Sequence, residues 1–336
     1  MTPSNLVMAA SVAFLLTAVG TPAFRRLASS RGLVDRPNSR SSHTGVVARG
    51  GGLVLLLAAG VGVALVPVLW SNAALAVAAG AVLVGGVGLW DDRRGVSPPI
   101  RLAFQVLAAS LLVWHTGGLA RIPLPPPLDL EIGMFGGTIA ILWIVAVVNF
   151  YNFLDGIDGL ASLQGVVTGA GIAAAAWAPF SSALTAALAG GCVGFLLHNW
   201  SPARVFLGDV GSGTLGFCFA AAPFLAPAEL RPSAVLFVAF SLWLFLADAA
   251  FTLVRRLLRG ARIHQAHREH LYQLLVIGGW SHPRVSALIG LGSVMMTLVA
   301  LLAWRSTDVR WCWAGIALGA ALFAGELALA RRATTS

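Results

Sequence analysis

Apolar residues run in long, nearly unbroken stretches along the whole chain, separated by short polar segments. Most stretches have roughly 17 to 25 residues, the length that a helix needs to cross a hydrocarbon core of about 30 Å. Because they do not alternate, they favour helices over the strands of a membrane barrel. The pattern predicts one all-α, polytopic membrane domain over residues 1–336, with eleven transmembrane helices near residues 5–24, 50–70, 72–90, 100–119, 134–153, 160–178, 181–198, 212–228, 233–254, 284–304 and 311–330.

Composition supports this interpretation. Hydrophobic residues make up 58% of the chain, charged residues only 10%, and the mean hydropathy is +0.84, far from the composition of a soluble domain. The three cysteines, Cys192, Cys218 and Cys312, fall within predicted spans and have no metal-type spacing. We interpret them as small apolar packing residues.

The basic residues predict the orientation. All 22 are arginines, and the formal net charge is +9. With the N-terminus outside and eleven spans, only Arg121, Arg231, Arg305 and Arg310 lie on the outer side, whereas the other eighteen face the cytoplasm. This bias indicates a cytoplasmic C-terminus. The charge is therefore a topology signal, and we expect no nucleic-acid partner because no soluble domain could read a groove.

The conspicuous polar motifs all fall on the predicted cytoplasmic side. The outer connections are short or bland, the longest being "LARIPLPPPLDLEIG". Whatever the protein does, it should therefore do at the cytoplasmic surface. The five motif segments are "VDRPNSRSSHTGVVARGGGL" (34–53), "WDDRRGVSPPIRLAFQ" (90–105), "NFYNFLDGIDGLAS" (149–162), "HNWSPARVFLGDVGSGTLGF" (198–217) and "RRLLRGARIHQAHREHLYQLL" (255–275).

Acidic residues gather where predicted spans meet this surface: Asp91, Asp92, Asp155, Asp158 and Asp209. Clustered carboxylates repel one another, so a cation should compensate them. The candidates are the inner arginines or a divalent metal. Carboxylate and amide oxygens are the ligands that Mg²⁺ or Mn²⁺ prefers.

Asn149, Asn152, Asp155 and Asp158 follow one another at intervals of three, which predicts one polar stripe if the segment is helical. A polar helix end that caps backbone groups is the alternative, although capping explains one such residue better than four. Adjacent Asp91 and Asp92 would point about 100° apart on a helix. They can serve one charged centre only at a frayed end, or else form a solvated pair neutralised by arginines.

Two further segments are ambiguous. "GDVGSG" (208–213) predicts a glycine turn and a helix starting near Ser212, whose N–H groups would face an anion, but such turns are common. His264, His267 and His270 recur every third residue, which fits zinc poorly because no Cys or close carboxylate joins them. Imidazoles facing phosphates explain them equally well. The neighbouring arginines are typical of anchors for anionic lipid.

Taken together, "DRPNSRSSH", "RGGGL", "DDRRGVSPPIRLAFQ", "NFYNFLDGIDGLAS", "NWSPARVFLGDVGSGTLGF" and "AHREHLYQLL" resemble the motifs of a known family, in family order, over residues 35–275. The family is that of the polyprenyl-phosphate N-acetylhexosamine-1-phosphate transferases (glycosyltransferase family 4). It includes the phospho-N-acetylmuramoyl-pentapeptide translocase of peptidoglycan synthesis.

The resemblance implies a phosphoglycosyl transferase of the bacterial cytoplasmic membrane that joins a UDP-N-acetylhexosamine to undecaprenyl phosphate and releases UMP. It implies Mg²⁺, or Mn²⁺ in its place, as cofactor, membrane lipids as partners, and leaves a homodimer open. By motif position the catalytic residues would be Asp91, Asp92 and Asp209, with Asp91 accepting a proton from the lipid phosphate. Asp209 and Asn152 would hold the metal.

By the same resemblance, Asp158 and Phe206 would contact uracil, and the "HREH" residues would contact the nucleotide phosphates or the sugar. The full set of expected nucleotide- and substrate-binding residues is Asn149, Asp155, Asp158, Phe206, His267, Arg268, His270, Arg36, His43 and Arg101.

Departures from the family pattern indicate a branch. Ser41 stands where relatives often carry Lys, and "HREH" differs from the three consecutive histidines of the peptidoglycan translocase. This favours initiation of O-antigen or cell-wall polysaccharide over transfer of muramoyl-pentapeptide.

Two alternatives lie outside the family. A CDP-alcohol phosphatidyltransferase would need Ala-Arg after its first acidic pair, which "DGIDGLAS" lacks, and a transporter would need buried mid-membrane charges, of which we find only Glu326.

Overall fold

Helices form nearly all of the structure, a computed structural model that describes residues 2–37, 45–261, 267–306 and 308–335. Two short strands, β1 (Val34–Asp35) and β2 (Val47–Ala48), pair as an antiparallel hairpin. The α-helices are α1 (Pro3–Ser30), α2 (Gly52–Ala64), α3 (Asn72–Arg94), α4 (Pro98–Thr116), α5 (Gly136–Phe153), α6 (Leu160–Ala175), α7 (Pro179–Asn199), α8 (Gly208–Ala221), α9 (Arg231–Ser241), α10 (Trp243–Leu258), α11 (Leu271–Ile277), α12 (His282–Ser306) and α13 (Val309–Thr335). Three 3-10 turns, η1 (Gly133–Phe135), η2 (Ala222–Leu225) and η3 (Ala228–Leu230), extend them.

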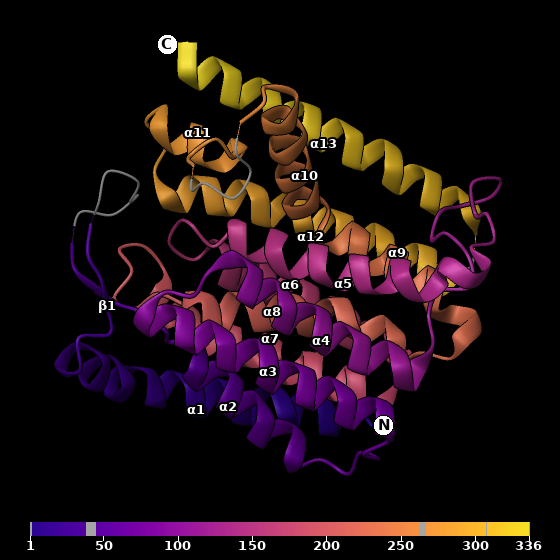
Figure 1. Cartoon of the computed structure of the whole chain (residues 1–336), viewed down its shortest axis with the longest axis horizontal. Helices are drawn as coiled ribbons and strands as arrows, with labels where there is room; N and C mark the ends of the chain where they lie inside the picture. The colour runs from indigo at the N-terminus through magenta and orange to yellow at the C-terminus, as the bar shows by residue number, and fades with distance from the viewer. Residues whose placement is uncertain (1, 38–44, 262–266, 307, 336) are drawn as a thin grey trace.

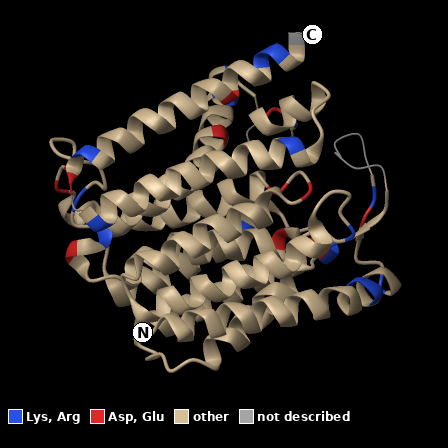
Figure 2. Ribbon diagram, turned by 180° about the vertical axis from the view of Figure 1, so that it is seen from behind, with Lys and Arg blue, Asp and Glu red and all other residues tan. Residues whose placement is uncertain are grey.

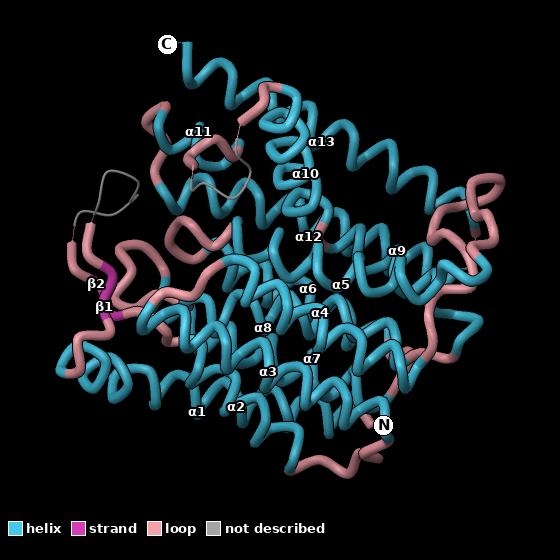
Figure 3. The backbone as a smooth tube through the Cα atoms, viewed as in Figure 1, coloured by secondary structure: helices cyan, strands magenta, loops and turns pink. Residues whose placement is uncertain are grey.

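The helices run back and forth between two ends of a bundle, and the two chain termini lie at opposite ends (Figure 1). Loops gather at both ends (Figure 3). One end holds the β hairpin and segments 154–159 and 200–207, and we call it the motif end. The opposite end holds segment 117–132, and we call it the far end. Charged residues lie mostly at the two ends, while the middles of most helices carry few (Figure 2).

The centre of the bundle is built from helices with many small residues. In an apolar stretch of 18 residues, 78% of the residues are buried in α7, but only 17% in α13 at the periphery. A Cβ atom at Gly190 would lie 2.0 Å from the Ala10 carbonyl oxygen, and one at Gly194 would lie 2.5 Å from that of Phe14. Glycine therefore lets α7 and α1 pack backbone against backbone, as small residues do between membrane helices.

Each of the eleven predicted stretches contains a helix, and the protein is a polytopic helical membrane protein. Six helices are long and apolar enough to cross a membrane, or seven if a bent pair counts as one span. Helices α2 and α6 are shorter than expected, and α8 begins at Gly208 instead of near Ser212. The number of crossings therefore stays a prediction.

The prediction of one continuous helix over residues 233–254 was wrong. Helices α9 and α10 meet at an angle of 79°. The bend is supported by polar partners, because Gln164 Nε2 donates to the Ser241 carbonyl at 2.8 Å and Ser293 Oγ donates to Gln164 Oε1 at 2.6 Å. A carbonyl freed by a break in an apolar helix needs such a donor. The kink also sets α10 at a steep angle to most of the other helices (Figure 1).

Candidate active site

Three carboxylates and two guanidinium groups form one cluster at the motif end. Asp91 and Asp92 lie in the last turn of α3, and Asp209 lies in the first turn of α8. Arg49 Nε lies 2.6 Å from Asp92 Oδ1, and its Nη2 lies 2.7 Å from Asp209 Oδ1. Arg101 Nη1, from α4, lies 3.0 Å from Asp91 Oδ2 and 2.9 Å from Asp209 Oδ2. Both arginines thus bridge Asp209 to the acidic pair.

Glycine allows this cluster to form. A Cβ at Gly88 of α3 would lie 2.6 Å from the Asp209 carbonyl oxygen, and one at Gly52 of α2 would lie 2.3 Å from Gly211 Cα. Gly208, directly before Asp209, has a φ of 75°, which L side chains rarely adopt. The backbones of α2, α3 and α8 therefore meet where the acidic side chains project.

Asp92 serves the start of α8. Its carboxylate accepts the N–H of Asp209 at 2.9 Å and the N–H of Val210 at 3.1 Å. The first turn of α8 therefore does offer N–H groups to an anion, as expected, but the anion is a carboxylate of the same chain. Asp91 instead accepts the N–H of Val96, in the turn after α3. Adjacent on α3, Asp91 and Asp92 therefore point in different directions. Arg101 connects Asp91 to Asp209, and Arg49 connects Asp92 to the same Asp209.

Asn149 and Asn152 share one face of α5, as predicted. Asn149 Nδ2 donates to Gln105 Oε1 at 2.6 Å, and Asn152 Nδ2 donates to Ser212 Oγ at 2.8 Å. Both line a small cavity of about 30 Å³ together with Asp209 and Arg101. The asparagines therefore reach the carboxylate cluster from α5.

The predicted stripe does not extend to Asp155 and Asp158, and that part of the prediction was wrong. Helix α5 ends at Phe153, and the chain reverses through Gly159, whose φ is 77°. Asp155 lies in the turn after α5, where it keeps a small accessible surface. Its partial removal from water, and then the negative charges of Asp209 and Asp92, raise its pKa well above the ordinary value. Asp155 is therefore near the carboxylate cluster, but because of the turn after α5 and not because of helical spacing.

Asp158 turns elsewhere. Its Oδ2 accepts the N–H of Ala203 at 3.1 Å and lies 3.4 Å from His282 Nδ1 at the start of α12. Burial alone would raise the pKa of Asp158, but the hydrogen bonds from His282, Ala203 and Ser201 lower it. This carboxylate therefore ties segment 154–159 to segment 200–207 and to α12.

The "HREH" motif is fixed by Asp248, a fully buried residue of α10. The Asp248 carboxylate lies 3.1 Å from His270 Nδ1 and accepts the N–H of Leu271 at 3.0 Å and that of Tyr272 at 3.3 Å. Tyr272 Oη in turn donates to the Phe153 carbonyl at 3.0 Å. These bonds cap α11 and bring the motif beside the end of α5.

Two polar atoms of this motif lack partners. His267 Nδ1 and Arg268 Nε are buried and have no hydrogen bond among the described residues. Burial, and then the neighbouring charges of His270 and Arg256, lower the pKa of His267 to about 4. His267 is therefore a neutral imidazole at neutral pH, and a buried nitrogen without a partner calls for an explanation such as a bound ligand.

The remaining predicted residues lie around the hairpin. Phe206 is half-buried, its N–H donates to the Ala48 carbonyl at 2.8 Å, and its carbonyl accepts from Gly51 at 2.9 Å. It therefore sits three residues before Asp209 on a segment joined to β2. Arg36 is exposed directly after β1. His43 lies outside the described residues, as do Ser41 and His264.

Several contributors were not among the predicted site residues. Arg49 joins two carboxylates. Its signals in the sequence were its place before the glycines of "RGGGL" and the presence of Ser41, which leaves Arg40 or Arg49 to supply the charge that relatives often place there as Lys. Gln105 and Asp248 act through hydrogen bonds from neighbouring helices, and His282 through its contact with Asp158. No spacing along the chain reveals such partners, because they come from elements that meet only in the folded protein.

The cluster fits a hard divalent cation by its donor chemistry. In the described part of the chain, no group of three or more His, Cys, Asp or Glu side chains forms a ready metal site. However, three carboxylates against two guanidinium groups leave one negative charge. The Asp209 carboxylate and the Asn152 amide line the same cavity and are oxygen donors of the type that Mg²⁺ takes. Metal binding there requires Arg49 or Arg101 to release Asp209.

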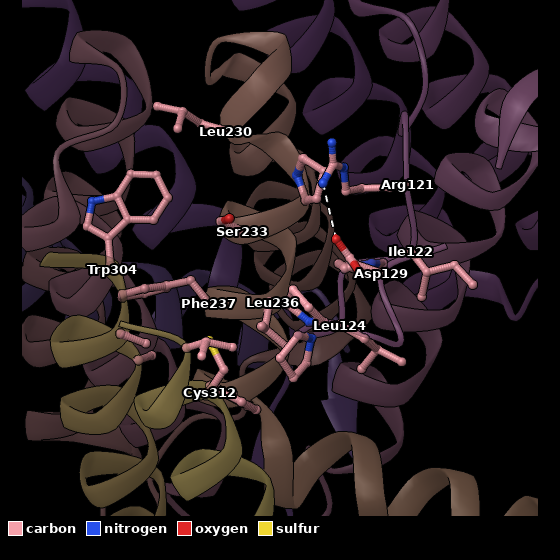
Figure 4. A pocket seen from close by; sticks show the side chains of 18 of the residues that line it. Arg121, Ile122, Leu124, Asp129, Leu230, Ser233, Leu236, Phe237, Trp304 and Cys312 are labelled. Carbon is pink, nitrogen blue, oxygen red and sulfur yellow. Dashed lines mark hydrogen bonds and ion pairs between the residues drawn. The ribbon is translucent and has the colours of Figure 1, made fainter. Parts of the chain in front are cut away.

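A larger cavity of about 550 Å³ lies at the far end. Its wall contains Phe237, Trp304 and Cys312, and the Arg121–Asp129 ion pair crosses its rim at 3.1 Å (Figure 4). None of the predicted site residues lines it. The polar chemistry of the described residues is therefore concentrated at the motif end and not in the more spacious cavity.

The fold and the site define a class of protein, a polytopic helical membrane protein with a carboxylate–arginine cluster at one end of its bundle. The family model described as "Glycosyl transferase family 4" matches residues 74–226, and relatives of at least 30% identity match over most of the chain. The chain therefore belongs to this family of polyprenyl-phosphate N-acetylhexosamine-1-phosphate transferases. It is accordingly an integral membrane enzyme of transferase type.

Individual relatives cover most of the chain. A decaprenyl-phosphate N-acetylglucosaminephosphotransferase of Mycobacterium tuberculosis is 30% identical over 97% of this chain and 88% of its own. A probable undecaprenyl-phosphate N-acetylglucosaminyl 1-phosphate transferase of Bacillus subtilis is 29% identical over 85% and 81%. A phospho-N-acetylmuramoyl-pentapeptide-transferase of Synechococcus elongatus is 31% identical over 85% and 84%. These relatives argue against the phosphatidyltransferase and transporter alternatives.

Proposed function

We propose that the protein transfers an N-acetylhexosamine-1-phosphate from a UDP-sugar to undecaprenyl phosphate, releases UMP, and so initiates O-antigen or cell-wall polysaccharide synthesis. The motif end would face the cytoplasm of a bacterial inner membrane, with eleven crossings and an outer N-terminus. Support comes from the arginine bias and from termini at opposite ends of the bundle (Figure 1), as an odd number of crossings requires.

The carboxylate–arginine cluster is the observation that carries this proposal. The substrates bring several phosphate charges together, so the catalyst must chiefly position and neutralise them. Arg49 and Arg101 are held within 3.0 Å of carboxylates and can turn toward phosphates without leaving the site. Mg²⁺, or Mn²⁺, would supply the further positive charge when bound, with Asp209 and Asn152 as its protein ligands.

The reaction exchanges one phosphorus–oxygen bond for another. An oxygen of the lipid phosphate attacks the β-phosphorus of the UDP-sugar, and the bond from that phosphorus to the oxygen of UMP breaks with its electron pair. Asp91 would take the proton of the lipid phosphate, since its carboxylate keeps one edge partly accessible beside Arg101. Asp92 would position Asp209 by holding the start of α8.

The nucleotide and sugar would lie between the cluster and the "HREH" motif. His267 and Arg268 have unpartnered buried nitrogens, which phosphate or sugar oxygens would satisfy, while His270 is held by Asp248. Phe206 and Asp158 would contact uracil, the latter through the part of its carboxylate that Ala203 and His282 leave open. The other residues proposed to bind the nucleotide or the substrate are Asn149, Asp155, Arg36 and His43.

Transfer can be tested with purified protein, undecaprenyl phosphate, Mg²⁺ and a panel of UDP-sugars. We expect UMP and a lipid-linked sugar from a UDP-N-acetylhexosamine. The second candidate is UDP-N-acetylmuramoyl-pentapeptide, because relatives of both types share about equal identity with this chain. Product with the pentapeptide alone would favour that function, and no UMP from any donor would refute the proposal.

A further inference from the structure

A cavity of about 260 Å³ lies between α10, α11 and α13. The C-terminal part of α13 and α11 lie at the same end of the bundle as the β hairpin (Figure 1). The cavity shares none of its lining residues with the carboxylate cluster or its small cavity. It is therefore a second site on the motif end.

The lining combines two kinds of side chain. Arg255 and Arg259 of α10 and Arg331 of α13 supply guanidinium groups, and Arg259 is 66% exposed. Leu271 and Leu274 of α11 are among the apolar residues of the wall. Among the residues that the structure describes, no Asp or Glu lines the cavity. A basic rim over an apolar wall matches a ligand with an anionic head and a hydrocarbon body.

Within the ion pairs that α10 makes with Glu269, positive charges outnumber negative ones. Glu269 is the carboxylate that faces the arginines of α10, and its Oε2 lies 3.5 Å from Arg255 Nη2 and 3.9 Å from Arg259 Nη1, while Arg256 contacts Oε1. One carboxylate therefore stands against three guanidinium groups. Arg255 Nη2 also donates to the Glu269 main-chain carbonyl at 2.6 Å, which orients its guanidinium group at the cavity. The long ion-pair distance of Arg259 leaves that side chain able to bind a phosphate, for which the planar guanidinium is well suited.

We propose that this cavity binds an anionic phospholipid from the adjacent leaflet, with its phosphate between Arg255, Arg259 and Arg331 and an acyl chain along the leucines of α11. A soluble anion would gain nothing from the apolar wall, and a zwitterionic lipid would leave the positive charge poorly compensated. Because α11 directly follows His270, a lipid bound here holds the "HREH" motif in place.

The test uses the full-length chain, purified in a neutral detergent, with phosphatidylglycerol or phosphatidylcholine added at equal concentration. Phosphatidylglycerol should raise the thermal unfolding midpoint and slow amide exchange in residues 271–277, and phosphatidylcholine should do so much less. The doubly substituted Arg259→Gln, Arg331→Gln variant should lose at least half of the midpoint shift. The matched control, Arg25→Gln with Arg26→Gln, changes two exposed arginines of α1 and should keep all of it.

Three outcomes would overturn the proposal. Equal shifts with both lipids would show that the site does not select charge, and a full shift in the Arg259, Arg331 variant would place the lipid elsewhere. An equal shift from inorganic phosphate at the same concentration would show a soluble anion site. If the variant does not fold, slowed exchange in residues 271–277 of the unaltered protein, compared with α1, still decides the question.

Discussion

Asp91, Asp92 and Asp209 differ in what each leaves accessible. The Asp92 side chain is fully buried, whereas those of Asp91 and Asp209 are 13% and 16% exposed. Both Asp92 oxygens bind backbone N–H groups of α8, so we assign Asp92 to positioning. Asp91 and Asp209 keep an accessible edge, and contact with substrate or metal falls to them.

Replacement of Asp209 tests this division directly. Asp209→Asn should lower UMP release at least about 100-fold, the usual loss when one electrostatic group of an active site is removed, and should weaken the response to added Mg²⁺. The control is Asp129→Asn at the far end, which breaks an exposed ion pair with Arg121 and should leave turnover unchanged. Equal losses in both variants would contradict the assignment of the site to the motif end.

His267 predicts a pH effect on stability. Its pKa of about 4 in the folded protein lies below the ordinary value of 6.5, so between these values the unfolded chain binds the additional proton. Stability from the neutral imidazole is thus present above pH 6.5 and is lost as the pH falls toward 4. His267→Gln should therefore lose less thermal stability than the unaltered protein between pH 7 and pH 5. An equal or greater loss would show that His267 is not the neutral group described.

At the scale of elements, the contact of α3 with α8 determines the site. Gly88 lets the α3 backbone touch that of Asp209, whereas Gly86, two residues earlier, has nothing within 4 Å of the position of a Cβ. The same helix therefore offers a matched pair of glycines, one needed for packing and one not.

Gly88→Ala should destabilise the protein by about 1–3 kcal/mol, as overpacking does, and should reduce turnover by displacing Asp209 from the arginines. Gly86→Ala, in open space on the same helix, should stabilise or leave unchanged the thermal unfolding midpoint, because Ala favours helix. Unfolding midpoints and UMP release for the two variants check this. Similar behaviour of both would mean that α3 and α8 are not held in contact.

The sequence indicated the helices and the clustering of motifs at one end, because hydrophobic length and charge bias are local signals. The predicted span 134–153 ends where α5 ends, but the spacing of Asn149, Asn152, Asp155 and Asp158 fitted a continued helix equally well, so the sequence did not show that the two aspartates leave the helical face. Nor did it show that Asp92 caps α8 or that Gln164 supports the break before α10. The last two contacts each join residues more than 70 positions apart along the chain.

At the scale of the whole molecule, the two ends of the bundle contain different polar groups. The motif end contains the carboxylate cluster, the "HREH" motif and the arginine-lined cavity, and the far end contains the Arg121–Asp129 pair. The middles of most helices between them carry few charges (Figure 2). A membrane around this bundle would place the two ends in different compartments.

Cysteine labelling tests that sidedness. In a variant whose three native cysteines are replaced by Ala, Arg121→Cys should react with a membrane-impermeant maleimide in intact spheroplasts, whereas Arg94→Cys should react only after lysis. Both positions are exposed at opposite ends of the bundle. Labelling of both in intact spheroplasts would reject the proposed topology, and the reverse pattern would invert it.

The absence of side chains between α3 and α8 at Gly88 has a consequence for how substrates enter. Two backbones in direct contact cannot separate by rotamer changes alone, so we expect the backbone positions of Asp92 and Asp209 to change little during turnover. We therefore expect access for a bulky nucleotide and a long isoprenoid to come from displacement of segments 154–159 and 267–270, in which Asp158 and His270 make side-chain hydrogen bonds to neighbouring elements. Turnover should consequently depend on how quickly those two peripheral loops open and close.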